Sequence, residues 1–600
     1  MPLSPPQYLS KIPIYFHFLR EKHCFFKKIA YNKKAASSGQ NVFSPLMRSK
    51  SEFRKVTYGQ MKKYTQSKIT GAERLQNSTN TVADFLKRNR RLILLCIFAT
   101  FIWGFLAHSY IFLHSSFSHD SLNEFYPKRF GNDLRIQYGR VFVPGYRFLL
   151  RSSFTLPWLI GVLSLFYISI AVFLTVRLFD VRSDVLTVLI AGIFTVNITV
   201  TATAATYIHD LDCDMLSLAL AVFAVYLWKK YDKGFLYGMI PLCLSIGLYQ
   251  AFISTAITLI LLYLIMQLLD GEPFAVVFKK GIRSIGMLLG GGVLYFLSMK
   301  AIGYITGIAL VSGEYNSMDT VFSMSVPNII STACKGYKET LFRIKTVPSL
   351  YPQNVMIPIH FAMVGLAGIF ILLRIFQKEI KVKEKILTLI LIALLPIGMD
   401  VVYTLTGGIS HDLMHFAMWL VYLFVLLVAW RVVEQCKSLK PLWKYGQRAV
   451  LVCLISVVLW GNVQTANAAY LKKDIEQQAN LSLFTRVVDR MENYDGYVTG
   501  TTPVVFVGEP GSVLSTVPGF DPLYLNMTGC WTPFVVDQDK QIRYSAYFDY
   551  ALLNPAVMAD PNTWDRMHVD SRVTAMPCYP TEGSVAIIDG VMVVKLGESD

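Results

Sequence analysis

The stretch SHDSLNEF, residues 118–125, places acidic side chains a few residues beyond the first long apolar segment of the chain. Asp120 would lie close to the end of that segment, where a carboxylate can act as a general base and take a proton from an attacking hydroxyl. Glu124 would share a face with Asp120 in a helical loop, and His119 would lie beside them as a substrate ligand. The alternative is structural, because Asp120 can cap a short helix whose first turn then contains Glu124.

Basic side chains follow these acids in the same loop, and they are Lys128, Arg129, Arg135, Arg140, Arg147 and Arg151. Guanidinium groups match phosphate oxygens well, so the loop can neutralise a phosphate or pyrophosphate that leaves from a lipid. We expect Arg129, Arg135 and Arg140 to bind this part of a substrate. Contact with anionic lipid head groups is the alternative.

A second acidic cluster, TYIHDLDCD, covers residues 206–214 and contains Tyr207, His209, Asp210, Asp212 and Asp214. Carboxylates at the end of a membrane span are costly unless they face a polar cavity or bind a cation or sugar hydroxyls. The spacing resembles part of a calcium loop, but the glycine and the later glutamate of such a loop are absent. We therefore expect Tyr207, Asp210 and Asp212 to bind substrate hydroxyls. A divalent cation is possible here, but no metal site is predicted.

Three smaller sets of polar residues lie at the same ends of the apolar runs. Tyr249 and Gln250 would contact substrate, unless they only anchor the chain at the membrane interface. A basic set in the later loop would hold a lipid phosphate from the opposite side, and its predicted members are Lys335, Lys338 and Arg343. The stretch SHDLMH, residues 410–415, has two histidines four residues apart, but it lacks a third metal ligand.

The elements that must position these residues are membrane spans. Of the 600 residues 53% are hydrophobic and only 16% are charged, against roughly 25% charged in soluble domains. Eleven apolar runs approach the roughly 20 residues that a spanning helix needs. They are residues 92–113, 156–176, 185–203, 215–228, 234–248, 251–269, 285–308, 355–375, 386–405, 413–430 and 450–466. Since the fourth and fifth are short, the number could differ by one or two, or one run could be re-entrant.

The distribution of charge predicts the orientation. Residues 1–91 contain 19 Lys or Arg against 4 acids and should lie in the cytoplasm, as should the other short basic loops. The chain would then have a transmembrane domain at residues 92–466 with outer loops 114–153 and 309–354, followed by an extracytoplasmic region at residues 467–600. The net charge of +17 thus reflects membrane topology, and no nucleic-acid partner is implied.

The C-terminal region, residues 467–600, begins with a helical pattern and continues with strand-like pieces. Its clearest signal is residues 584–596, in which two apolar runs flank Asp589-Gly590, as in a β-hairpin. We expect a small α+β domain that closes over the outer face of the membrane bundle. Cys530 and Cys578 could form a disulfide outside the cell or remain free thiols, because sequence does not fix their geometry.

These pieces, in this order, resemble the multispanning type II (Gtr-like) glucosyltransferases that modify O-antigen, within the GT-C superfamily of lipid-dependent glycosyltransferases. The resemblance covers roughly residues 92–596. It rests on SHDSLNEF followed by YGR, on TYIHDLDCDMLSLALAVFAVYL, on LSIGLYQAFIS and on MPCYPTEGSVAIIDGVMVVKL.

This resemblance implies transfer of a hexose, usually glucose, from a polyprenyl-phosphate donor to a cell-surface glycan on the outer face of a bacterial cell membrane, with no cofactor required. The first-loop acid of the superfamily falls on Asp120, with Glu124 as its rival. Members often have adjacent acids in this loop, whereas Ser121 follows Asp120 here, which leaves the identity of the base open.

Two other classes of function compete with this one. A flippase or transporter of lipid-linked sugars predicts ionisable residues near span centres and broken helices. The glycine-rich run at residues 286–296 would suit a transporter, but the charges gather at the outer ends, which favours chemistry at the membrane surface. A scaffold with an external binding domain would not need the acids and arginines of the first loop. No glycine-rich nucleotide loop is present, as expected for a lipid-linked donor.

Overall fold

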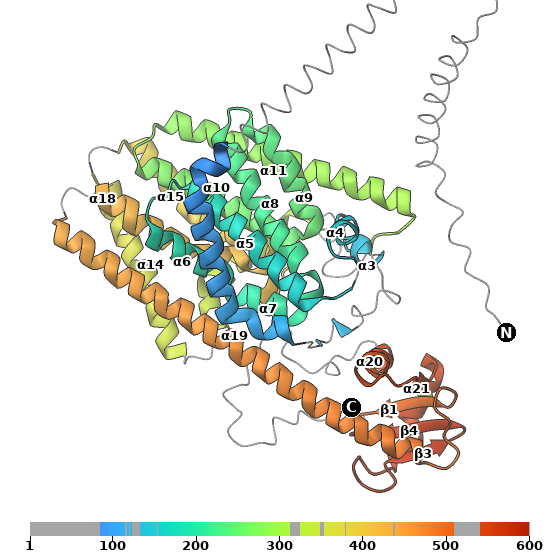
Figure 1. Ribbon diagram of the computed structural model, residues 1–600. Helices are drawn as coiled ribbons and strands as arrows, with labels where there is room; N and C mark the ends of the chain where they lie inside the picture. The colour runs from blue at the N-terminus through green and yellow to red at the C-terminus, as the bar shows by residue number, and fades with distance from the viewer. Residues whose placement is uncertain are drawn as a thin grey trace, which may run out of the picture. The chain divides into compact units, whose positions relative to one another are not determined.

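The computed structural model describes residues 84–114, 117–118, 121–122, 133–152, 154–311, 324–347, 353–377, 380–435, 439–508 and 540–598. The contacts reported below lie within one compact unit, Asn89–Asp600. Most of this unit is helical (Figure 1).

Nine helices in the described ranges are long and apolar enough to cross a membrane. They are Asp84–Leu113, Pro157–Leu178, Asp184–Thr206, Ile208–Lys230, Gln250–Leu269, Phe274–Thr306, Val355–Ile375, Phe416–Gln435 and Pro441–Glu492. The chain is therefore a polytopic helical membrane protein, with nine candidate spans where the sequence predicted about eleven. The remaining two predicted runs are also helical, but each lacks a property of a spanning helix.

The first of these two helices, α9 (Gly234–Leu248), has 15 residues, fewer than the roughly 20 that cross a bilayer. The second, α15 (Val382–Met399), has three charged residues directly after Val382 and ends before Asp400. The predicted run 386–405 is thus two helices, α15 and the short α16 (Val401–Leu405), and not one straight span.

Other spans are also assembled from shorter pieces. Asp184–Thr206 consists of α6 (Asp184–Thr195) and α7 (Ile198–Thr206), which meet at the buried Asn197. The side-chain oxygen of Asn197 accepts a hydrogen bond from the Val200 amide and caps α7, while its amide nitrogen donates to the carbonyl of Ile193 in α6. A single side chain therefore satisfies backbone groups on both sides of the break.

The interior of the bundle is built around α8 (Leu211–Lys230), most of whose residues are buried. This helix packs against α5 (Pro157–Leu178) and α9, and α10 (Ile253–Leu269) packs against α15. The remaining helices of the bundle are α11 (Phe274–Thr306), α13 (Val326–Phe342), α14 (Gln353–Ile375), α17 (Leu420–Leu427) and α18 (Val433–Gln435).

The longest helix, α19 (Pro441–Glu492), has 52 residues and continues from the last span into the C-terminal region (Figure 1). It contains the helix that the sequence predicted after residue 467, without a break at that position. Phe484, Val487 and Met491 near its end belong to the apolar core of the C-terminal strands. Leu122 of the first loop is buried in the same core.

That core surrounds a four-stranded sheet with the order β2-β1-β4-β3. The strands are β1 (Pro503–Val507), β2 (Val557–Met558), β3 (Val585–Ile588) and β4 (Val591–Lys595), and the helices beside them are α20 (Lys540–Tyr547), α21 (Pro561–Val569) and α22 (Ser571–Thr574). β1 is parallel to both of its neighbours, whereas β3 and β4 are antiparallel.

The antiparallel pair β3–β4 is the hairpin that the sequence predicted at residues 584–596. Asp589 and Gly590 connect its strands, and both have positive φ, as a two-residue turn of this kind requires. The predicted disulfide stays a prediction, because Cys530 lies outside the described residues. Cys578 itself donates a hydrogen bond to Glu598 at a distance of 3.5 Å between sulfur and oxygen.

Candidate active site

The arginines of the first predicted outer loop lie on two short helices. α3 (Asp133–Gln137) contains Arg135, and a turn leads through Arg140 to α4 (Val143–Leu150). Arg147 lies in the last turn of α4 and Arg151 caps it, donating its backbone N–H to the Arg147 carbonyl. Because these two arginines are four residues apart, they point to the same side of the helix.

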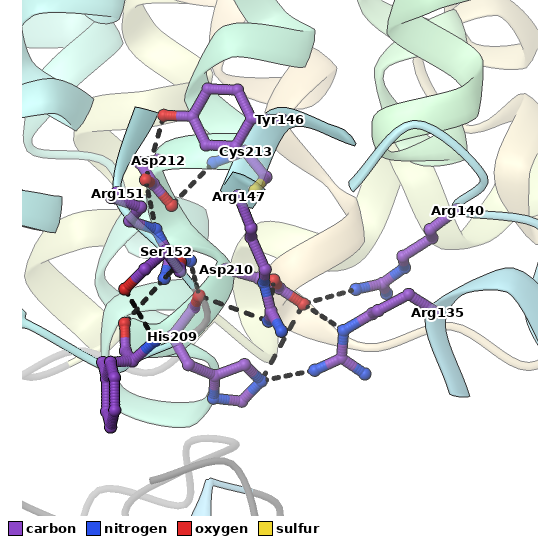
Figure 2. Close-up of polar contacts among 11 residues, drawn as sticks. Arg135, Arg140, Tyr146, Arg147, Arg151, Ser152, His209, Asp210, Asp212 and Cys213 are labelled. Atoms are coloured by element: carbon purple, nitrogen blue, oxygen red, sulfur yellow. Dashed lines mark hydrogen bonds and ion pairs between the residues drawn. The ribbon is translucent and has the colours of Figure 1, made fainter. Parts of the chain in front are cut away.

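Three of the four arginines surround one carboxylate, that of Asp210 at the start of α8 (Figure 2). Arg135 Nε lies 2.6 Å from Oδ2 of Asp210, and Arg147 Nη2 lies 2.6 Å from Oδ1. Arg140 Nη1 is further away, at 3.6 Å from Oδ2. Asp210 is completely buried, and a buried carboxylate is tolerated only when it is paired in this way.

The next acidic residue, Asp212, has its own partners (Figure 2). Its Oδ2 accepts hydrogen bonds from Arg151 Nε at 2.7 Å and from the Tyr146 hydroxyl at 2.9 Å. Arg151 also donates to the carbonyls of His209 and Phe154, so its guanidinium is largely occupied. We call Arg135, Arg140, Arg147, Arg151, His209, Asp210 and Asp212 the arginine–aspartate cluster.

The ring of His209 has one occupied and one unoccupied nitrogen. Arg135 Nη2 lies 2.7 Å from Nε2 of His209, and a guanidinium can only donate, so Nε2 accepts and the ring hydrogen lies on Nδ1. Among the residues that the structure describes, Nδ1 has no hydrogen-bond partner, although His209 is buried. The cluster thus retains one buried donor that its own residues do not use.

Arg140 differs from the other arginines of the cluster. Its side chain is 16% exposed, whereas those of Arg135, Arg147 and Arg151 are at most 7% exposed. The guanidinium lies 4.6 Å from the ring centre of Tyr249 and 5.9 Å from that of Tyr207, as in a cation–π contact. Burial opposes its charge, but Asp214 and the other nearby acidic groups outweigh burial and raise the pKa of Arg140, which therefore stays protonated.

The turn before Arg140 is fixed by side chains that donate hydrogen bonds to its backbone carbonyls. Tyr295 of α11 donates its hydroxyl to the Gly139 carbonyl at 3.0 Å, and Gln250 Nε2 donates to the Tyr138 carbonyl at 2.9 Å. Gly139 has a φ of 75°, and a Cβ added there would lie 2.5 Å from the Tyr295 hydroxyl. Only glycine fits at this position, and the turn that it allows places Arg140 over the ring of Tyr249.

The described part of the preceding loop lies against the same region. Ser118 donates its hydroxyl to the Thr206 carbonyl at 2.7 Å, one residue before Tyr207. Its backbone N–H donates to the hydroxyl of Ser121, and the Ser121 N–H donates back to the Ser118 hydroxyl. Both serines are completely buried. The loop on either side of residues 119–120 is thereby held at the end of α7.

A model of the glucosyl transferase GtrII family matches residues 109–428, more than half of the chain. The chain belongs to this family. No curated protein and no solved structure matches it. The resemblance to the type II glucosyltransferases is thus confirmed, and the chain is a member of a membrane glycosyltransferase family.

The GtrII match includes the whole arginine–aspartate cluster, and it ends before α19 and the C-terminal strands. Several of the site residues predicted from the sequence come together in that cluster or line it, namely Arg135, Arg140, Tyr207, Asp210, Asp212 and Tyr249. Gln250 lies beside the cluster, where its amide holds the Tyr138 carbonyl. The carboxylates of Asp210 and Asp212 are paired with arginines, an arrangement that leaves them less suited to bind sugar hydroxyls than predicted.

The basic set in the later loop lies elsewhere. Lys335 and Lys338 are exposed on α13, and Arg343 follows in the short 3₁₀ helix η4 (Arg343–Lys345). Arg343 Nη1 lies 3.6 Å from Oδ1 of Asp412, and its Nη2 donates to the Ser410 hydroxyl at 3.4 Å. Within the described ranges, no ion pair connects these three residues to the arginine–aspartate cluster.

Other predicted site residues, namely His119, Asp120, Glu124 and Arg129, lie outside the described residues, and their roles stay predictions. The sequence prediction did not include Tyr146 and did not assign a role to Arg147 or Arg151 as partners of the aspartates. The four-residue spacing of Arg147 and Arg151 is the signal that could have revealed their role. Residues at this spacing share one face of a helix, and here that face contacts the start of α8. No group of three metal-ligating side chains occurs in the described part of the chain.

Proposed function

We propose that this chain transfers a hexose, glucose, from a polyprenyl-phosphate donor to a cell-surface glycan on the outer face of the cell membrane. The observation that supports this proposal is Arg140, whose guanidinium lies 4.6 Å from the ring centre of Tyr249 and 5.9 Å from that of Tyr207. Among the described residues its one ion pair is the long contact with Asp210. Its remaining donors are available for an anion, and phosphate is the anion that a guanidinium binds best.

The charges of the cluster favour the same ligand. Four guanidinium groups pair with the two carboxylates of Asp210 and Asp212, so the arginine charges of the cluster outnumber its carboxylate charges. An incoming phosphate would offset this excess in a buried place, where charge interactions are strong. The unoccupied Nδ1–H of His209 adds a neutral donor to the same site.

The proposed reaction breaks the bond between the anomeric carbon and the phosphate oxygen and forms a bond from that carbon to an acceptor hydroxyl oxygen. The electron pair of the broken bond leaves with the polyprenyl phosphate, whose growing charge Arg140 stabilises. A phosphate leaves without protonation, so no general acid is needed. The proton of the acceptor hydroxyl passes to a general base, for which we propose Asp120, with Glu124 as the second candidate.

The contacts of the first loop support this choice of base. Ser118 and Ser121, which flank residues 119–120, are buried; Ser118 donates its hydroxyl to the carbonyl of Thr206, and Ser121 is hydrogen-bonded to Ser118. Thr206 immediately precedes Tyr207, whose ring lies under the guanidinium of Arg140. A carboxylate from this loop would therefore act close to the phosphate end of a bound donor.

The proposed orientation follows from the basic loops at the opposite ends of the helices. Lys229 and Arg177 lie at the end of α8 and α5 that is remote from Asp210, where cytoplasmic positive charge is expected. The cluster, the first loop and the C-terminal region would then face the outside, as in the GT-C enzymes that use lipid-linked sugars.

The test uses membranes that contain the wild-type chain, Asp120→Asn, Arg140→Gln or Arg486→Gln, incubated with labelled polyprenyl-phosphate glucose and cell-envelope glycan. Arg486 is exposed on α19 and serves as the matched control. We expect label in the glycan for the wild type and the control and a loss of at least 100-fold for the other two variants. Full transfer by Arg140→Gln would contradict the proposed phosphate site.

A second experiment tests the alternative function, transport of a lipid-linked sugar. If the wild-type chain, reconstituted in vesicles, moved polyprenyl-phosphate glucose across the bilayer and transferred no sugar with any of several donors, the chain would be a transporter of lipid-linked sugars.

A further inference from the structure

A second buried polar site lies where the chain breaks between α15 and α17. Asp400 separates α15 from α16, and His415 separates two short 3₁₀ helices, η5 (Asp412–Met414) and η6 (Phe416–Trp419). Their side chains face each other, with His415 Nδ1 3.2 Å from Oδ1 of Asp400. Asp400 is 3% exposed and His415 is 2% exposed.

The polar atoms of this pair are not satisfied by the protein. Among the described residues, neither carboxylate oxygen of Asp400 and neither ring nitrogen of His415 has a partner in hydrogen-bond geometry. His415 Nδ1 and Asp400 Oδ1 still face each other as an ion pair, which leaves Asp400 Oδ2 and His415 Nε2 without any contact of this kind in the described part of the chain. Buried polar groups are nearly always hydrogen-bonded, so these two atoms indicate that something else binds there. His108 shows the contrast, because this equally buried ring is bound by the Tyr470 hydroxyl at 2.8 Å and the Thr195 carbonyl at 2.9 Å.

The neighbouring helix α10 adds hydroxyl groups. It lies against the end of α15, since a Cβ on Gly398 would be 2.7 Å from the Leu261 side chain and 3.1 Å from that of Ile257. The beginning of α10 has three buried hydroxyls, those of Ser254, Thr255 and Thr258, and none has a hydrogen-bond partner among the described residues. Thr175 in α5 shows the usual arrangement, because its hydroxyl donates to the Ala171 carbonyl at 2.8 Å, whereas Thr100 and Thr206 are single buried hydroxyls without a partner among the described residues.

The helices are interrupted at both members of this pair, at Asp400 between α15 and α16 and at His415 between η5 and η6. η5 packs against α7, and Thr199 donates its hydroxyl to the Asp412 carbonyl at 2.8 Å. Irregular backbone among membrane helices is stable where it is buried in protein or lines a polar cavity. Asp412, three residues before His415, carries a charge of its own and pairs with Arg343 on η4.

A row of aromatic rings connects this pair to the arginine–aspartate cluster. Tyr249, which lies under Arg140, has its ring centre 5.6 Å from that of Phe252. Phe252 in turn lies 5.6 Å from Phe416, the residue after His415. The two polar sites are therefore connected in the bundle through these three packed rings.

We propose that Asp400 and His415 form a subsite that binds hydroxyl groups of the transferred hexose, next to the arginine–aspartate cluster that takes its phosphate. This inference rests on the proposed function. Two carboxylate oxygens can accept from neighbouring hydroxyls of a sugar, and an imidazole can both donate to and accept from a third. The negative charge of Asp400 disfavours a phosphate in the same place, so the subsite takes the neutral part of the donor.

The test compares binding of two lipids to the purified full-length chain in lipid nanodiscs: polyprenyl-phosphate glucose and polyprenyl phosphate without sugar. Asp400→Asn and His415→Gln keep the size of the side chains, and Asp232→Asn, in the exposed loop after α8, is the control. We expect each of the first two variants to weaken binding of the sugar-bearing lipid at least tenfold and binding of the bare lipid less than twofold. Arg140→Gln should weaken both.

Equal losses for both lipids, or no loss, in both Asp400→Asn and His415→Gln would overturn the hexose subsite and leave the proposed function intact. If excess Mg²⁺ or Mn²⁺ restored binding of the sugar-bearing lipid to Asp400→Asn, the hexose subsite would also be overturned, in favour of a cation site. If the wild-type chain bound neither lipid, the proposed function itself would fail, and the subsite with it. Thermal unfolding of each variant identifies those that have lost the fold, and the other member of the pair then decides the result.

Discussion

Arg147 Nη2 lies 2.6 Å from Oδ1 of Asp210, and both side chains are buried at the junction of α4 and α8. This contact joins the first loop to the centre of the bundle. Arg135 and Arg140 approach the same carboxylate from the other side, so Asp210 is shared by three guanidinium groups. The Arg147–Asp210 pair therefore has a structural role, whereas Arg140 retains hydrogen-bond donors for a ligand.

We predict that removing either member of this pair destabilises the fold. Arg147→Gln removes one of the guanidinium partners of Asp210, and Asp210→Asn removes the carboxylate charge that Arg135, Arg140 and Arg147 share. Breaking a buried ion pair in this way costs about 3–5 kcal/mol of the free energy of unfolding. The double variant should lose less than the sum of the two single losses, because both changes remove the same contact. Thermal unfolding in detergent measures all three. Strictly additive losses would show that Arg147 and Asp210 do not interact.

Gly139 should not tolerate a side chain. Gly139→Ala forces a strained φ and brings a Cβ to 2.5 Å from the Tyr295 hydroxyl, so the turn that places Arg140 must shift. We expect a stability loss of about 1–3 kcal/mol and a clear rise in the KM for the lipid donor. Gly145→Ala is the matched control, because no atom lies within 4 Å of a Cβ at this position in α4. Equal activity of the two variants would argue against a fixed turn.

The sequence located most of the charged residues of the cluster, because charges at the ends of apolar runs are conspicuous. It did not show how they pair, since Asp210 and Arg147 are 63 residues apart and meet only when α4 folds onto α8. Asp400 and His415 were harder to find. Residues 386–405 have the hydropathy of one span, and nothing in that pattern indicates that the helix breaks at Asp400 beside a buried histidine.

Hydropathy also misleads at the start of the C-terminal region. The apolar run ends near residue 466, where the sequence predicted a domain boundary, but α19 continues to Glu492. The reason is that helical periodicity persists after the apolar residues stop, with buried Phe484 and Val487 facing the strands. The β3–β4 hairpin was predictable because its turn, Asp589-Gly590, is a local signal that no distant contact overrides.

The orientation of the chain can be tested by labelling. Val569 is exposed at the end of α21, and Tyr231 is exposed in the loop after α8. We expect a membrane-impermeant maleimide to modify Val569→Cys in intact cells and Tyr231→Cys only after permeabilisation, above the labelling of the wild-type chain. The opposite pattern would place the arginine–aspartate cluster on the cytoplasmic side and contradict the proposed site of sugar transfer.

The C-terminal region should lose local order in acid. Hydrogen bonds from the Arg572 side chain and backbone lower the pKa of Asp570 to about 2, and Asp570 caps α22. Because the pKa of Asp570 is lower in the folded chain than in the unfolded chain, its carboxylate stabilises the fold at pH values above the unfolded pKa of roughly 3.9. This contribution disappears as the pH falls toward 2. Hydrogen exchange of residues 571–574 should therefore accelerate between pH 4 and pH 2. In Asp570→Asn the exchange rate, corrected for its intrinsic pH dependence, should not change over this range.

Tyr249 should contribute to donor binding through its ring. The guanidinium of Arg140 lies 4.6 Å from the centre of that ring, and a desolvated cation–π contact of this kind is worth about 1–2 kcal/mol. Tyr249→Leu removes the ring, so Arg140 loses its support and affinity for polyprenyl-phosphate glucose should fall roughly five- to thirtyfold. Tyr249→Phe keeps the ring and should bind nearly as well as the wild type. If Tyr249→Phe lost as much affinity as Tyr249→Leu, the hydroxyl and not the ring would be the contributing group, and Arg140 would be held by its neighbouring carboxylates alone.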